Sequence, residues 1–196
     1  MKKFEIKYAP GATPLDPNET NGLIPDYITT QGELNILERN NILEAESWAY
    51  GKKHSVILSI TFCYKLHKRM LSHVWKWAGQ PRQTNKNIGV FKEQIPTQLH
   101  LLFKDTEYWI KNDTYRWDDI GVRFHHRLVS IHAFSNGNGR HARLMTDLLL
   151  KLHGQQPFSW GMKTAQGSLD VEGNSRKEYI AALREADANK FDRLFR

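Results

Sequence analysis

The residues best suited to chemistry lie in one short segment, HAFSNGNGRHAR at 132–143. Glycine adopts positive φ freely and asparagine tolerates it, so the Gly-Asn-Gly sequence at 137–139 can point successive backbone N–H groups into one concavity, which binds anions. The helix predicted to begin there adds free N–H groups and the positive end of its dipole. Arg140 and Arg143 are three residues apart on one face of that helix, and arginine donates two parallel hydrogen bonds to phosphate. These residues predict a phosphate-binding turn.

His132 is predicted at the C-terminal end of the preceding helix, five residues before Gly137. An imidazole can accept a proton from an incoming hydroxyl near neutral pH. A base beside a phosphate-binding turn indicates phosphoryl-type transfer, which depends mostly on positioning and on stabilisation of charge. The part that the segment does not supply is an evident metal ligand.

Each of these features also has a purely structural interpretation. Glycine-rich turns between helices are commonly only turns, and His132 could simply bond to a helix carbonyl. The ordered combination of a base, a glycine turn and two arginines between apolar helices favours the functional interpretation. A zinc hydrolase is a distant alternative, because His125, His126 and His141 lie close to His132 in sequence, but no HExxH pattern accompanies them.

Apolar periodicity predicts helices on both sides of the segment, so the fold class is mainly α. Ile120, Phe124, Leu128 and Ile131 share a face before it, and residues 145–152 are apolar at helical spacing after it. Further helices are predicted at 30–51, 55–73 and 97–111, and again from about residue 175. A small β-hairpin is expected around Asn87–Phe91, and the proline-rich residues 1–28 are expected to form an extended arm.

The composition is that of a globular protein with a mild basic excess. The 196 residues include 28 Lys and Arg against 21 Asp and Glu, a net charge of +7, and no run of like charges concentrates it. Nucleic acid is therefore an improbable partner. Cys63 is the only cysteine, which excludes an internal disulfide. Neither a signal-peptide core nor an apolar run of the ~18 residues that a membrane span needs is present, so a cytoplasmic location without membrane attachment is expected.

The segment HAFSNGNGRHAR resembles the Fic motif, commonly written HxFx(D/E)GNGRxxR, of the Fic/Doc superfamily. With its GLIPDYITTQGELN lead, the chain resembles the Fic subgroup called mobile mystery protein B over nearly its whole length. The resemblance implies a compact Fic-type helical bundle with a small β-hairpin flap. The resemblance divides the chain into two parts. Residues 1–54 would be an N-terminal arm and first helix, and residues 55–196 would be the Fic domain.

The activity that the resemblance implies is protein adenylylation, the transfer of AMP from ATP to a Ser, Thr or Tyr hydroxyl of a target protein. In that interpretation His132 deprotonates the hydroxyl, and attack on the α-phosphate expels pyrophosphate. The flap that includes Ile88, Gly89 and Val90 would align the target segment beside His132 by strand-type pairing.

The resemblance also assigns nucleotide-binding residues. Gly137, Asn138 and Gly139 would form the anion hole, with Asn138 also reaching a phosphate. Arg140 and Arg143 would hold the outer phosphates.

Two features bear on metal binding and regulation. The acidic motif position that usually holds Mg²⁺ is Asn136, whose amide oxygen can ligate a hard cation but carries no charge, so weaker Mg²⁺ binding is expected. Many Fic proteins are inhibited by a helix with the pattern (S/T)xxxE(G/N), and Thr29 to Glu33 fits its first five positions. Glu33 would then pair with Arg143, although a capping box also explains Thr30 and Glu33. A separate antitoxin-like regulator is the other possibility.

Two alternatives to protein adenylylation stay open. The same fold could transfer another phosphate-containing group or remove AMP, which the amide at Asn136 leaves open. The chain could instead be a non-catalytic module that binds nucleotide or nucleic acid. Such a module predicts an affinity for DNA that falls steeply with salt.

Overall fold

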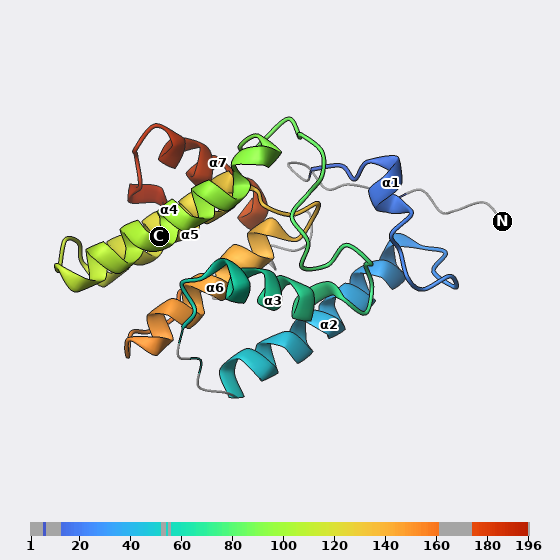
Figure 1. The fold of residues 1–196 in the computed structure, drawn as a ribbon, viewed down its shortest axis with the longest axis horizontal. Coiled ribbons are helices and arrows are strands. Elements are labelled where there is room, and N and C mark those ends of the chain that lie inside the picture. Colours follow the sequence, from blue (N-terminus) through green and yellow to red (C-terminus); the bar gives the residue numbers. More distant parts are fainter. Residues whose placement is uncertain (1–5, 7–12, 52–53, 55, 161–173, 196) are drawn as a thin grey trace.

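The computed structural model describes residues 6, 13–51, 54, 56–160 and 174–195 (Figure 1). Its helices are α1 (Pro17–Thr20), α2 (Gln31–Gly51), α3 (Ile60–Leu71), α4 (Ile95–Lys111), α5 (Trp117–Ile131), α6 (Asn138–Leu152) and α7 (Asn174–Asp187), with short 3₁₀ turns at Lys92–Gln94 and Asp192–Phe195. The prediction of a mainly α fold is confirmed. Within the described residues, none of the helices has both the length and the apolarity that crossing a membrane requires.

The helices enclose one apolar core around α6 (Figure 1). α5 packs on α6 and on α4, while α3 lies between α2 and α6. The predicted stripe of α5 is buried, with Phe124 fully enclosed, and Met145 and Leu149 of α6 are fully buried as well. Leu34 of α2 joins the same core, so the N-terminal helix and the remainder of the chain share their apolar interior.

α6 begins at the Gly-Asn-Gly sequence as predicted, whereas α3 starts later than predicted for a local reason. α3 begins at Ile60 rather than near 55, because the Ser59 hydroxyl accepts a hydrogen bond from the Phe62 N–H (3.2 Å) and caps the helix. α6 already begins at Asn138, so the Gly-Asn-Gly sequence forms its first turn. The predicted anion-binding amides therefore belong to a helix N-terminus.

The predicted β-hairpin is wrong. Residues 83–91, here called the flap loop, form bends, and the described part of the chain has only an isolated bridge between Leu23 and Trp75. The flap loop bonds to other segments instead of to itself: the Val90 N–H donates to the Ile131 carbonyl (3.4 Å). An isolated two-stranded hairpin is only marginally stable in water, so contacts with other segments decide the shape of the flap loop.

Candidate active site

The turn between α5 and α6 needs two residues in the left-handed region. His132 ends α5 with φ 53° and ψ 56°, and Gly137 precedes α6 with φ 78°. A Cβ at Gly137 would lie 2.8 Å from Leu71 Cδ1, so only glycine fits there. The first intrahelical bond of α6 runs from the His141 N–H to the Gly137 carbonyl (2.9 Å). The N–H groups of Asn138 and Gly139 precede that bond and are suited to an anion.

The side chain of Asn138 holds this turn closed from the inside. Its Oδ1 accepts from the Phe134 N–H (2.9 Å) and its Nδ2 donates to the Phe134 carbonyl (2.8 Å). These two bonds engage the Asn138 amide with Phe134, and its contact with a phosphate stays a prediction. Phe134 is buried, as an anchor of the turn should be.

His67 on α3 supports the same turn and was not singled out from the sequence. Its ring stacks on Phe134 with centroids 3.6 Å apart. Nδ1 accepts from the Gly79 N–H (2.9 Å), so Nε2 carries the proton and donates to the Asn136 carbonyl (3.0 Å). Burial lowers the pKa of His67 well below its usual value, and the ring is neutral. Its partner lies 69 residues away along the chain, so no local pattern could have indicated it.

His132 is placed as a base would be. Its side chain is buried (8% exposed for the residue), and burial, followed by the charges of Arg82 and Lys86, lowers its pKa to about 4. The imidazole is therefore neutral at pH 7, with a lone pair available. Within the described residues, its Nε2 has no hydrogen-bond partner. A neutral imidazole of this kind can accept a proton from a hydroxyl that comes within reach.

The two arginines extend in different directions from α6. Arg140 donates to Glu38 Oε2 on α2 (2.7 Å), a buried carboxylate that also accepts from Trp75 Nε1 (2.6 Å). Arg143 lies beside Gly139 and over the ring of Tyr179 on α7, 5.7 Å from its centroid. Glu38 and Tyr179 were both missed, because each belongs to a helix far from the motif in sequence.

In the described part of the chain, the side chain predicted to hold Mg²⁺ is already engaged by other groups. Asn136 Oδ1 already accepts from the Gly137 N–H (2.5 Å) and from Arg140 Nη2 (3.4 Å). An oxygen that faces two donors, one of them a cation, is a poor ligand for Mg²⁺. Among the residues that the structure describes, no cluster of three or more His, Cys, Asp or Glu could hold a metal ion.

The histidines proposed as zinc ligands are also engaged by other groups of the protein. His125 bonds to the Tyr179 hydroxyl (2.8 Å), His126 to Asp187 (2.8 Å) and His141 to the Cys63 carbonyl (3.0 Å). His125 and His126 thus bond to two different residues of α7 and His141 to α3, so each ring has its own protein partner.

Glu33 does not make the predicted pair with Arg143. It is an exposed carboxylate that accepts from the backbone N–H groups of Thr29 (2.8 Å) and Thr30 (3.0 Å), and these bonds lower its pKa. Glu33 N–H in turn donates to the Thr30 hydroxyl (3.2 Å), which completes the capping box. The helix start occupies this side chain, and a separate antitoxin-like regulator stays a prediction.

The flap loop lies directly against His132. A Cβ at Gly89 would be 2.6 Å from the Cβ of His132, so the backbone of the loop packs directly against His132. Val90 is half-buried, while Ile88 (46% exposed) faces solvent. A hollow of about 340 Å³ borders the loop, lined by Asn85, Lys86, Gly89, Val90, Phe91 and Gln94.

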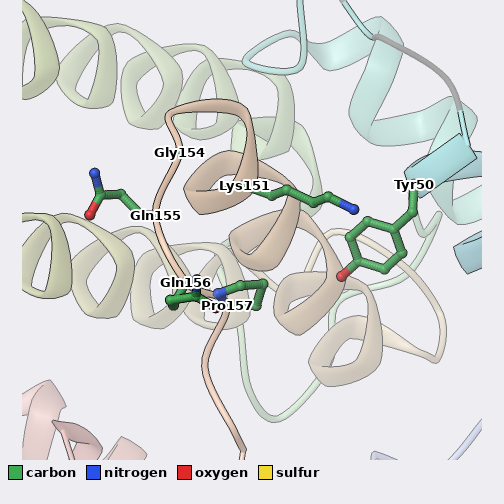
Figure 2. Close-up of a pocket in the computed structure, with 6 residues that line it drawn as sticks. All are labelled: Tyr50, Lys151, Gly154, Gln155, Gln156 and Pro157. Atoms are coloured by element: carbon green, nitrogen blue, oxygen red, sulfur yellow. The ribbon is translucent and has the colours of Figure 1, made fainter.

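A second pocket, of about 410 Å³, is lined by Tyr50, Lys151, Gly154, Gln155, Gln156 and Pro157 (Figure 2). The ammonium of Lys151 points toward the ring of Tyr50, 4.4 Å from its centroid. Lys151 stands near the C-terminal end of α6, about 20 Å along the helix from Asn138 at 1.5 Å per residue. This pocket is separate from the candidate active site.

The fold and the site define a class: helical proteins that present a glycine turn at a helix N-terminus beside a neutral imidazole. Residues 57–150 match the model of the Fic/DOC family. The chain belongs to this family.

Relatives and solved structures agree with this assignment. The chain is 31% identical over 141 residues to protein adenylyltransferase fic-1 of Caenorhabditis elegans. This alignment covers 70% of this chain and 25% of the relative. It is 33% identical over 147 residues to protein adenylyltransferase Fic of Drosophila grimshawi, covering 71% and 30%. The chain thus spans less than a third of these relatives.

A solved structure of similar fold is the BepC protein of Bartonella tribocorum, a VirB-translocated effector with bound AMPPNP. Its TM-score is 0.70 at 15% identity, covering 92% of this chain and 95% of that one. At this level of identity the similarity concerns the fold, which is the helical Fic fold.

Proposed function

We propose that this protein is a protein adenylyltransferase that transfers AMP from ATP to a Ser, Thr or Tyr hydroxyl of a target protein, with His132 as general base. The observation that carries the proposal is the buried, neutral His132 whose Nε2 is unpartnered among the described residues, next to the turn that opens α6. The relatives named adenylyltransferases and the AMPPNP bound by BepC support ATP as the donor.

In the proposed reaction, His132 Nε2 accepts the proton of the target hydroxyl. The oxygen attacks the α-phosphorus of ATP, the bond from that phosphorus to the bridging oxygen of the β-phosphate breaks, and pyrophosphate leaves. The products are a phosphodiester that links AMP to the target, pyrophosphate and a proton on the imidazole. Mg²⁺ would shield phosphate charge when bound, and the described residues offer it no cluster of three or more His, Cys, Asp or Glu.

Charge stabilisation in this scheme comes from the start of α6. The amides of Asn138 and Gly139 precede the first intrahelical bond, and Arg143 lies beside Gly139. These donors are fixed before a nucleotide arrives, because Asn138 and His67 hold the turn from behind. Preorganised donors stabilise developing charge without reorganisation, which is usually the largest contribution to catalysis.

The decisive experiment uses ATP labelled at the α- or the γ-phosphate, with the purified chain and candidate target proteins. Label from the α-phosphate, and not from the γ-phosphate, should become covalently attached to protein. His132→Ala should abolish transfer while nucleotide binding persists, and His100→Ala, at an exposed histidine of α4, serves as the matched control. Transfer by the His132→Ala variant at the wild-type rate would refute the role of His132.

A different donor within the same fold is the second candidate, and the amide at Asn136 is the observation that favours it. Parallel incubations with labelled GTP and UTP separate the two, because only the true donor should label protein. Release of AMP from a previously modified protein would instead identify the reverse reaction.

A further inference from the structure

Arg82 is a buried cation whose hydrogen-bond partners are backbone carbonyls. Its Nε donates to the His132 carbonyl (2.7 Å), its Nη1 to the Thr84 carbonyl (2.8 Å) and its Nη2 to the Val90 carbonyl. Its own N–H donates to the Ala133 carbonyl (2.9 Å). One side chain therefore joins both ends of the flap loop to the residue proposed as the base.

The geometry explains why arginine occupies this position. The three carbonyls come from segments that do not pair with each other as strands, so no ladder of N–H groups is available to them. A planar guanidinium presents several donors in a fixed fork, whereas the ammonium of lysine is a single centre on a flexible stem. Arg82 thus takes the place of the cross-strand bonds that a hairpin would have made.

Lys86 fixes the other side of the flap loop to α1. Its Nζ lies 2.8 Å from Asp16 Oδ2 and 2.6 Å from Glu19 Oε2, and its side chain is only 4% exposed. Thr84 adds a bond from its hydroxyl to Asp16 Oδ2 (2.5 Å). The Lys86–Glu19 pair is shielded, with Glu19 11% exposed, while Asp16 is 40% exposed, and these charge-assisted bonds connect the loop to α1.

The two attachments matter because the loop packs directly against His132. Gly89 lies against His132, and a shift of the loop would change what can approach its Nε2. Asp16 and Glu19 lie outside residues 57–150, the region that matches the family model.

We infer that Arg82, together with the Asp16–Glu19–Lys86 cluster, positions the flap loop for the target polypeptide, so that α1 is a working part of the target-binding surface. These are positioning residues, since they touch the loop and the backbone of His132 rather than the reacting atoms. The activity readout of this inference rests on the proposed function. Its structural readout is independent of that function.

The structural readout is hydrogen exchange of the full chain over residues 83–91, for Lys86→Met, the double variant Asp16→Asn with Glu19→Gln, and Arg82→Lys. Exchange in this loop should accelerate at least ~10-fold in each variant, while α5 and α6 keep wild-type protection. Lys104→Met, which removes an exposed pair with Glu107 on α4, is the matched control and should change nothing. Wild-type exchange over 83–91 in all three test variants would overturn the inference.

The activity readout compares two acceptors of AMP. With labelled ATP, transfer to a polypeptide, here the His132→Ala chain supplied as acceptor, is measured beside release of free AMP to water. The variants should lower the ratio of transfer to release at least ~10-fold with nucleotide affinity unchanged, because water does not need an aligned loop. An unchanged ratio would overturn the inference. If the wild type neither transfers nor releases AMP, the proposed function fails, while the exchange experiment still decides the inference.

Discussion

Four buried histidines predict that the fold is sensitive to mild acid. Burial is the largest cause of a lowered pKa in each: about 3 for His125, about 4 for His132 and His141, and well below the usual value for His67. An unfolded chain would restore these pKa values to about 6.5. Between the two sets of values the unfolded state binds more protons, so the free energy of unfolding falls as the pH falls from about 6.5.

The size of the effect follows from proton counting at pH 5.5. The three histidines with stated values would be about 90% protonated when unfolded and almost unprotonated when folded, a difference of about 2.7 protons. Asp147 opposes this, because burial raises its pKa to about 6 and the folded state holds about 0.7 of a proton more than the unfolded state. The balance of about two protons corresponds to a loss of about 3 kcal/mol per pH unit, to which His67 adds in the same direction.

Urea unfolding followed by circular dichroism at pH 7, 6 and 5.5 measures this slope. His141→Gln keeps an N–H donor for the Cys63 carbonyl but does not titrate, so its slope at pH 5.5 should be smaller by about 1.2 kcal/mol per pH unit. His100→Gln, at an exposed position, should follow the wild type. A free energy of unfolding that is equal at pH 7 and pH 5.5 would refute the reasoning.

Three substitutions test the turn and its neighbours. Asn138→Ala removes the side chain that bonds to the buried N–H and carbonyl of Phe134, so the free energy of unfolding in urea should fall by about 3 kcal/mol. Nucleotide binding should be lost as well. An unchanged urea midpoint would contradict the role of this side chain. Asn136→Asp should lower the Mg²⁺ concentration needed for half-maximal transfer, and no shift would mean that this side chain does not touch the ion. Glu33→Gly should lower the melting temperature slightly and leave self-modification unchanged, because Glu33 caps its own helix; a faster rate would restore an inhibitory role.

Local patterns predicted the parts of the molecule that local physics decides. The apolar stripe around Phe124 defined a helix and its buried face, since packing at helical spacing needs no distant partner. The glycine turn was likewise predicted from φ preferences alone, and Gly137 has the positive φ that the prediction required.

The features that sequence reasoning missed depend on contacts between distant parts of the chain. The hairpin failed because Arg82 joins carbonyls of the flap loop to the carbonyl of His132, 50 residues away. Glu38 was invisible because its partner, Arg140, is 102 residues away. Periodicity and spacing carry no information on such pairs.

Side-chain bonds to the backbone also fix the geometry of the candidate site. Arg82, Asn138 and His67 place their hydrogen bonds on backbone groups of the turn and the flap loop, so the backbone geometry is set by the folded core. Glu38 holds Arg140 with a short ion pair, and a bound phosphate would have to share or replace that carboxylate. A nucleotide therefore competes with Glu38 for Arg140, and Glu38→Gln, which removes the charge of that competitor, should strengthen the binding of ATP in a titration; an unchanged affinity would contradict the competition.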